Sequence, residues 1–274
     1  MDDYIIFSDS KDILVKDFQT IQKILGQKSL NINSDKTVLF SEKNISISEE
    51  VDGMKSNIME RFSVGSGSGL DYEDYEEAVR ELDESEVAYL ISLLDEEKAT
   101  DAEASLILDC IHEHSTNFSD YLPAFLLRFP HLSKKIYHKC GDVEDDDLES
   151  LAGVFVEKVK SEFALNEYQL FWIAKIAEKY FLSTTFAGEL LSLLYEHKNA
   201  TNISKAKILE IPEQRFGMPE WREIHLKNGT SGWLSWASAI GMRNETKQNR
   251  NYLMGYFSKI SPMNALIADF ITSQ

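Results

Sequence analysis

The fold of this chain is decided by its central stretch, 145-DDDLESLAGVFVEKVKSEF-163 followed by 166-NEYQLFWIAKIAEKYF-181. In both segments apolar residues recur at the three- and four-residue spacing of one helix face. Only residues 164 and 165 separate the two segments, so we expect two consecutive helices joined by a short turn. This unit of helix, short turn and helix is the pattern on which the rest of the interpretation is built.

The same pattern runs from Tyr72 to the end of the chain. Short helices joined by short turns are typical of stacked helical hairpins of the HEAT-like kind. No fixed sequence period is visible, so an irregular helical bundle remains the alternative. The predicted helices cover 72–82, 85–95, 100–115, 119–128, 132–139, 145–163, 166–181, 184–197, 203–209, 219–227, 231–241, 246–258 and 262–272.

The first 42 residues have a different pattern, which predicts a small α/β block. Residues 3–8 read as a strand, and Ser10 is a suitable N-cap for a helix that ends before Gly26. Residues 29–33 and 37–41 read as two further strands around a turn. The Ser- and Gly-rich segment 43–70 then predicts a linker, which leaves 71–274 as the helical domain.

Charge is distributed unevenly along the chain. The net charge is −18, and residues 71–116 contain 16 acidic but only 2 basic residues. Such a segment repels nucleic acid, so we expect a solvated face there, or as the alternative a surface for a protein partner or for self-assembly. No apolar run approaches the ~20 residues of a membrane helix and no secretory signal is visible, which favours a cytoplasmic protein whose two cysteines are reduced and buried.

The N-terminal block carries the most specific motifs. The run from Met1 to Ser10, Met-Asp-Asp-Tyr-Ile-Ile-Phe-Ser-Asp-Ser, resembles the Tyr-x-Asp-Asp signature of a reverse-transcriptase palm, with Met1 at the variable position. The run from Leu30 to Thr37, Leu-Asn-Ile-Asn-Ser-Asp-Lys-Thr, resembles the Leu-Asn-x-x-Lys-Thr turn of the next palm motif. The two motifs stand in the expected order with a helix between them.

This resemblance implies nucleotidyl transfer with two Mg²⁺ ions, which carboxylates bind well. Asp2 would be a metal ligand, Asp3 a supporting carboxylate, and Lys36 would lie near the triphosphate. The third carboxylate and the fingers of the palm belong upstream of these motifs. We therefore expect this chain alone to be inactive, as a fragment, a product with a misassigned start or one piece of a split protein.

A palm followed by a long helical domain resembles the bacterial defence-associated reverse transcriptases, including the abortive-infection type. The resemblance implies RNA-directed DNA synthesis, with nucleic acid and dNTPs as partners and a helical domain in place of the thumb. It also allows priming from a tyrosine, although none of the 11 tyrosines stands out. The alternative is a non-catalytic helical scaffold that binds protein or nucleic acid, and either protein could form homo-oligomers.

Two further clusters of residues are candidate binding sites. Arg243, Lys247, Arg250 and Tyr252 combine basic and aromatic residues, which suits contact with a single strand; core packing plus solvated charge is the alternative. The second cluster consists of cysteine and histidine residues, which either bind zinc or have ordinary roles in the core and on the surface. We favour the ordinary roles, because residues two apart on a helix diverge. Its members are Cys110, His112, His114, His138 and Cys140.

Overall fold

The protein is described by a computed structural model, in which residues 6, 8, 10–27, 53–63, 72–95, 98–115, 117–161 and 165–273 are described. The chain divides into two compact units, Met1–Phe118 and Ser119–Gln274. All regular structure in the described residues is helical, and no strand is present among them. The expected strands 29–33 and 37–41 lie outside the described residues, while Ile6 and Ser8 of the expected first strand are not in a strand.

The described N-terminal residues form one amphipathic helix, α1 (Lys11–Gln27). It confirms the helix predicted after Ser10, whose carbonyl accepts the first helical hydrogen bond from Leu14 at 3.0 Å. Leu14, Phe18, Ile21 and Leu25 follow one another along one face. None of the described side chains of α1 is fully buried.

The rest of the first unit consists of four short helices, α3 (Gly53–Ser63), α4 (Tyr72–Arg80), α5 (Glu84–Asp95) and α6 (Asp101–His114). Helices α4 and α5 both pack against α6. The N-terminus of α6 is closed by a capping box, in which the Glu103 carboxylate accepts from the Thr100 backbone N–H at 2.9 Å. The acidic segment 71–116 is therefore the surface of a packed helical unit.

Helix α3 corrects the expectation that 43–70 is an open linker. Ile58 is buried, and Phe62 packs edge-on against Tyr75 of α4 with 5.6 Å between ring centroids. Arg61 forms an ion pair with Glu86 of α5 at 2.5 Å. These contacts hold residues 53–63 on the first unit, so at least this part of the segment is structural. The glycines of 65–69 lie outside the described residues.

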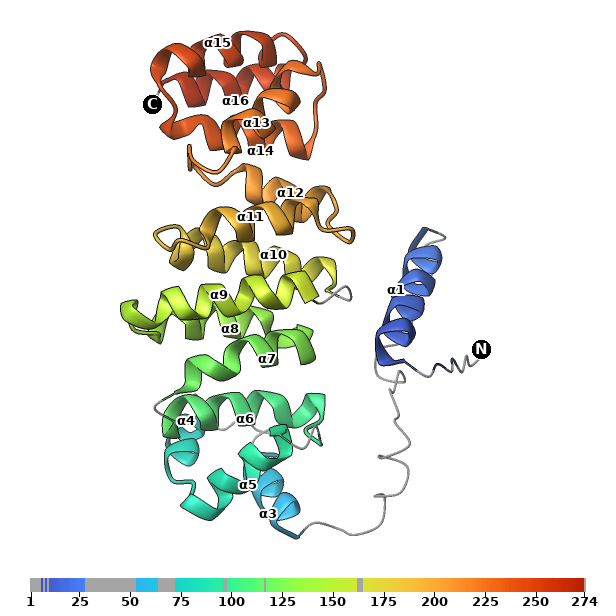
Figure 1. The fold of residues 1–274 in the computed structure, drawn as a ribbon, viewed down its shortest axis with the longest axis vertical. Coiled ribbons are helices and arrows are strands. Elements are labelled where there is room, and N and C mark those ends of the chain that lie inside the picture. The colour runs from blue at the N-terminus through green and yellow to red at the C-terminus, as the bar shows by residue number, and fades with distance from the viewer. Residues whose placement is uncertain are drawn as a thin grey trace. The chain divides into compact units, whose positions relative to one another are not determined.

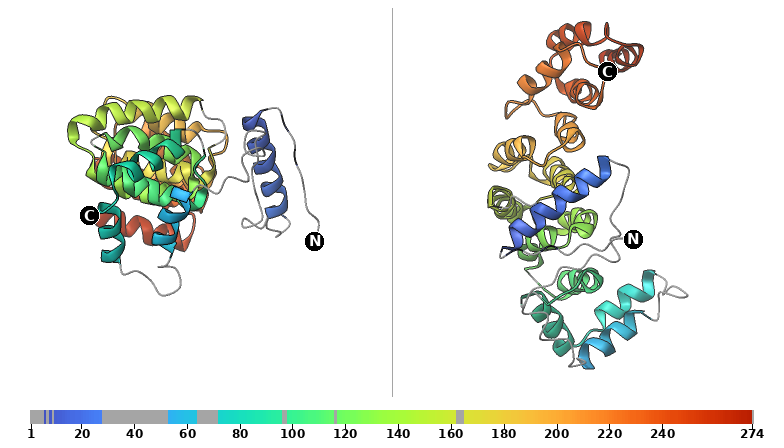
Figure 2. Two further views of the ribbon diagram at one scale, coloured as in Figure 1. Left: turned by 90° about the horizontal axis from the view of Figure 1, so that it is seen from below. Right: turned by 90° about the vertical axis from the view of Figure 1, so that its right-hand side faces the viewer.

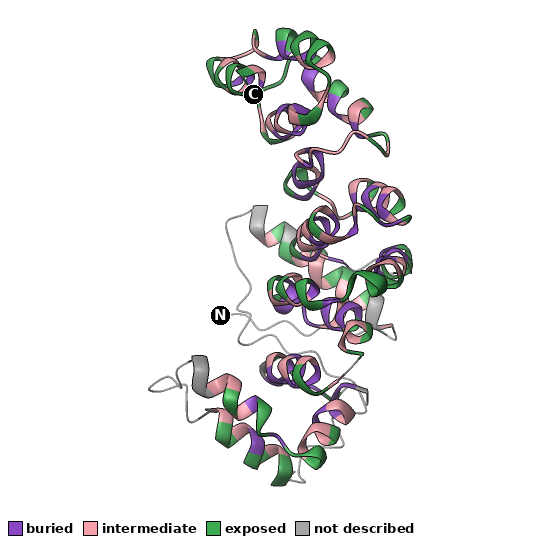
Figure 3. Cartoon of the chain, turned by 90° about the vertical axis from the view of Figure 1, so that its left-hand side faces the viewer, coloured by how far each residue is buried: buried purple, intermediate pink, exposed green. Residues whose placement is uncertain are grey.

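The second unit is a stack of helix pairs in two layers (Figures 1 and 2). One layer is formed by the contacts α8–α10, α10–α12, α12–α14 and α14–α16, and the other contains the contacts α7–α9, α9–α11 and α13–α15. Buried residues recur along the helices of this stack (purple in Figure 3). The helices are α7 (Leu122–Arg128), α8 (Ser133–Lys139), α9 (Asp145–Ser161), α10 (Glu167–Ile176), α11 (Ala187–Glu196), α12 (Asn202–Leu209), α13 (Met218–Lys227), α14 (Trp233–Gly241), α15 (Lys247–Phe257) and α16 (Pro262–Ser273).

This stack confirms the predicted succession of short helices, with local differences. Of the predicted helix 119–128 only Leu122–Arg128 is α-helical, and Phe118–Tyr121 form a 3₁₀ helix. The predicted helix 166–181 is α-helical only over Glu167–Ile176, and Ala177–Phe181 form a π-helix. Asn166 starts α10 by accepting from the Gln169 backbone N–H at 2.9 Å. The Gln169 side chain also donates to the carbonyl of Leu126 in α7 at 2.7 Å, which ties two helix pairs together. None of the described helices is long and apolar enough to cross a membrane.

Candidate functional site

The predicted catalytic residues Asp2, Asp3 and Lys36 lie outside the described residues, and so does the proposed Mg²⁺ site. What is described is α1, the helix that separates the two palm-like motifs. Its stripe of Leu14 and Phe18 is only half-buried. Ile13 and Ile24, at the edge of this stripe, are 54% and 51% exposed. A helix with one broad apolar face normally packs against another element, and among the described residues this face is covered only in part.

The predicted nucleic-acid residues are described, but they do not all converge. Lys247, Arg250 and Tyr252 lie on α15, and Arg243 lies in the short 3₁₀ turn before it. Arg250 and Tyr252 are two positions apart, which places them roughly 200° apart around the helix. Arg250 turns back to donate to the carbonyl of Arg243 at 2.9 Å, whereas Tyr252 is 51% exposed. Arg250 and Tyr252 therefore do not share one face of α15, and contact of the four residues with a single strand of nucleic acid stays a prediction.

The structure instead assembles a different group of residues around Tyr252. Tyr252 and Tyr256 are one turn apart on α15, with their rings edge to face at 5.2 Å and their hydroxyls 3.3 Å apart. Lys227 from α13 places its ammonium 5.0 Å from the Tyr252 ring centroid and 5.9 Å from that of Tyr256. Lys227 is also paired with Glu223 on its own helix. We call Lys227, Tyr252 and Tyr256 the lysine–tyrosine cluster.

Electrostatics couples the members of this cluster. The pKa of Tyr252 is lowered, first by the hydrogen bond from Tyr256 and then by the positive charge of Lys227. The pKa of Tyr256 is raised, because its proton is held in the hydrogen bond to Tyr252. The pKa of Lys227 is raised mainly by Glu223. The cluster places the Lys227 ammonium, with its partner Glu223, beside two exposed tyrosine rings, and aromatic rings next to a cation can stack on the bases of a single strand.

The surroundings of the cluster differ in charge from the rest of the chain. Residues 218–274 contain six Lys/Arg and four Asp/Glu, so this segment has a charge of +2 in a chain whose net charge is −18. Trp233 at the start of α14 is 67% exposed, and Leu266 and Phe270 on α16 are 66% and 60% exposed. The C-terminal helices thus carry less negative charge than the chain as a whole.

No metal site is formed by the described cysteines and histidines, and no group of three possible ligands is found among the described residues. Cys110 and Cys140 are buried, as predicted, and burial raises the pKa of each thiol to about 12. His112 packs edge-on against Phe118, and His114 contacts the carbonyl of Val79 at 2.8 Å. These are ordinary packing roles, in agreement with the preferred interpretation.

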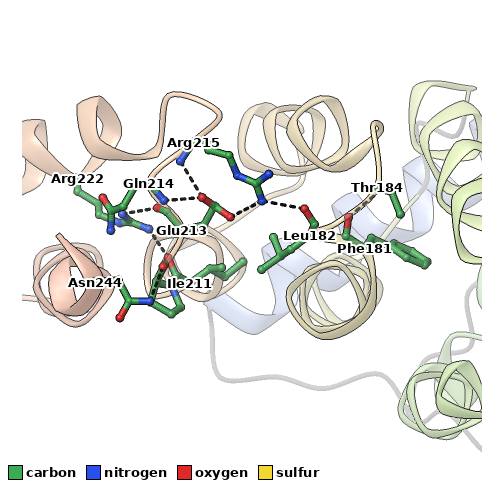
Figure 4. A network of polar contacts seen from close by, with 10 residues as sticks. Phe181, Leu182, Thr184, Ile211, Glu213, Gln214, Arg215, Arg222 and Asn244 are labelled. Atoms are coloured by element: carbon green, nitrogen blue, oxygen red, sulfur yellow. Dashed lines mark hydrogen bonds and ion pairs between the residues drawn. The ribbon is translucent and has the colours of Figure 1, made fainter. Parts of the chain in front are cut away.

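A buried arginine was not identified from the sequence. Arg222 of α13 is 0% exposed and donates to the carbonyl of Leu209 at 2.9 Å. It also donates to the carbonyls of Glu213 at 2.8 Å and of Ile211 (Figure 4). Burial lowers the pKa of Arg222 to about 10, so it remains protonated at neutral pH. The guanidinium closes the C-terminal end of α12 and fixes the loop that leads to α13. Its role is to hold the C-terminal helices, including the lysine–tyrosine cluster, on the stack.

The same loop has a second polar anchor. Glu213 accepts from Arg215 at 2.7 Å, and Arg215 also donates to the carbonyl of Leu182 at 3.0 Å (Figure 4). Asn244, after α14, donates to the carbonyl of Pro212 at 3.1 Å. The hydrogen bonds from Arg215, together with backbone N–H groups, lower the pKa of Glu213 to about 2. Comparison of the chain with protein-family models, with curated proteins and with solved structures found no match.

Proposed function

We propose that this chain is the terminal palm segment and HEAT-like helical-repeat domain of a bacterial, defence-type, RNA-directed DNA polymerase of the cytoplasm. The observation that carries the proposal is the order of its parts. An Asp-Asp pair and an apolar run precede α1, the run from Leu30 to Thr37 that resembles Leu-Asn-x-x-Lys-Thr follows it, and a stack of short helices occupies the second unit. The two motifs flank α1 in the order that the family resemblance requires.

The shape of α1 supports this proposal. In an α/β unit of the expected kind, a helix buries one apolar face against the sheet. Leu14, Phe18, Ile21 and Leu25 provide such a face, which the described residues leave at most half-covered. A palm sheet would bury it.

The residues would then have the following roles. Asp2 would bind Mg²⁺, Asp3 would support the metal site, and Lys36 would neutralise charge at the triphosphate. Catalysis would occur only when upstream palm and fingers segments complete the carboxylate set. The helical stack would serve as the scaffold that shapes the path of nucleic acid.

The test begins with the codons in frame before Met1. A Tyr codon at the preceding position and an Asp-bearing strand motif within about 100 codons support the proposal. The extended protein is then assayed for dNTP incorporation with Mg²⁺ as wild type, Asp2→Ala and Asp17→Ala. Asp17 is an exposed carboxylate on α1 and is the matched control. We expect Asp2→Ala to lose at least 100-fold in rate while Asp17→Ala stays within about twofold. Equal activity of the Asp2 variant would rule out this assignment.

The second candidate function, a non-catalytic scaffold that binds a single strand of nucleic acid, is favoured by the lysine–tyrosine cluster. Aromatic stacking contributes about 1–3 kcal/mol per base, so Tyr252→Ala should weaken binding of labelled oligo-dT by roughly 5- to 100-fold. The control is Tyr168→Ala on α10, which is similarly exposed at 46%. Fluorescence anisotropy at two salt concentrations measures both. Equal affinity of wild type and Tyr252→Ala would remove the cluster from the binding surface.

A further inference from the structure

Helix α5 has one broad apolar face, and one edge of this face is only partly packed. Leu90, Leu93 and Leu94 are 1%, 6% and 7% exposed and face the interior of the first unit. Val87 and Ile91, one turn apart, lie at the edge of the same face beside Leu90 and Leu94, and they remain partly accessible.

This edge of α5 forms one side of a groove with a volume of about 310 Å³. The turn after α4 and the end of α6 form the other sides. The contact of His114 Nε2 with the Val79 carbonyl at 2.8 Å holds the imidazole in place at one side of the groove. The lining residues are Leu82, Glu84, Val87, Ala88, Ile91 and His114.

The border of this groove is acidic. Glu84 lies on the rim of the groove, and it is exposed. Glu81 and Asp83, on either side of the lining residue Leu82, are exposed as well, and the nearby Arg80 is paired with Glu76 at 3.5 Å and Glu113 at 3.2 Å. The groove therefore combines an apolar floor with a negative edge.

We propose that this groove binds an amphipathic helix of a protein partner, with aliphatic side chains in the groove and Lys or Arg residues against its acidic border. Helix-in-groove recognition uses apolar anchors at this kind of spacing. Complementary charge then selects a basic partner and excludes nucleic acid, which the same charges repel. The volume suits a few aliphatic side chains rather than a large ligand. The inference goes beyond the proposed function, because it does not require the chain to be catalytic.

The probes are three labelled synthetic peptides of about four helical turns. The first is an amphipathic Leu/Lys helix, the second has the same composition in scrambled order, and the third carries Glu in place of Lys. Their binding to the full chain is measured by fluorescence anisotropy at physiological ionic strength. We expect the first peptide to bind at least tenfold more tightly than the second, and the third not to bind.

Two substitutions locate the site. Ala88→Gln places an uncharged polar side chain over the groove at an exposed helical position, and it should weaken binding of the Leu/Lys helix about tenfold. Glu84→Lys reverses charge at the rim and should weaken binding about threefold or more, whereas Glu157→Lys, the same change at a 74% exposed site on α9, should have a smaller effect. Equal binding of the ordered and scrambled peptides would overturn the proposal. So would unchanged affinity in Ala88→Gln, or equal losses in the two charge reversals.

Discussion

Replacing Arg222 with methionine should loosen the C-terminal helices of the second unit more than any exposed charge substitution. Methionine keeps much of the volume of the side chain but removes every donor. The carbonyls of Leu209, Ile211 and Glu213 then lose a partner that is itself fully buried. Arg222→Lys, which keeps the charge but not the fork of donors, should lie between wild type and methionine.

The magnitude follows from two opposing contributions. A buried acceptor left without its donor costs about 1–3 kcal/mol, and three carbonyls are affected. Removal of the guanidinium also removes the free-energy cost of burying its charge, which is several kcal/mol. The pKa of about 10 for Arg222 reflects this cost. We therefore expect a net loss of roughly 2–5 kcal/mol in the free energy of opening α12–α14.

Native-state hydrogen exchange is the suitable measurement, because two compact units need not unfold together. Protection of amides in α12, α13 and α14 should fall in Arg222→Met. The matched control is Arg215→Met in the same loop, whose side chain is 60% exposed and whose loss should cost less than about 1 kcal/mol. Exchange in Arg222→Met within about 0.5 kcal/mol of wild type would show that the buried arginine is not a clamp.

Three further predictions concern the same region. Gly241→Ala should cost about 1–3 kcal/mol in thermal unfolding, because the new Cβ would overlap the Leu209 carbonyl and lie 2.9 Å from the Arg222 Cζ; stability equal to wild type would contradict this. Gly255→Ala on α15, where a Cβ meets nothing within 4 Å, should instead stabilise the protein by about 0.5–1 kcal/mol. A loss of stability there would show that the position has no room for a methyl group. Glu213 has a folded pKa of about 2 against 4.5, so its stabilisation is complete above pH 4.5 and disappears as pH falls toward 2. The difference in unfolding free energy between wild type and Glu213→Gln should therefore vanish over that range, and a difference independent of pH would argue against the ion pair.

The helices could be predicted from the sequence because their signals are local. The predicted helix 145–163 is observed as Asp145–Ser161, and the predicted helix 262–272 as Pro262–Ser273. Caps such as Thr246, which accepts from the Asn249 backbone N–H at 3.4 Å, mark their starts. Helix α3 was not predicted, because its apolar residues Met54, Ile58 and Phe62 lie between Ser- and Gly-rich stretches that indicate a linker. Its stability comes from contacts with α4, α5 and α6, which no local pattern contains.

The roles of the candidate site residues could not be predicted from the local sequence pattern. Arg222 and Lys227 are both basic residues of α13, and the sequence offers no reason to treat them differently. One is fully buried and binds carbonyls that precede it by 9 to 13 residues, while the other lies over tyrosines that follow it by 25 or more. Their roles are set by which helices stack, since α13 packs on α14 and on α15. The same reasoning separates Arg250 from Tyr252, although they are neighbours in the sequence. In a stack of short helices a basic or aromatic residue acquires its role from the next helix, so a run of such residues predicts a contact surface only after the face of each helix is known.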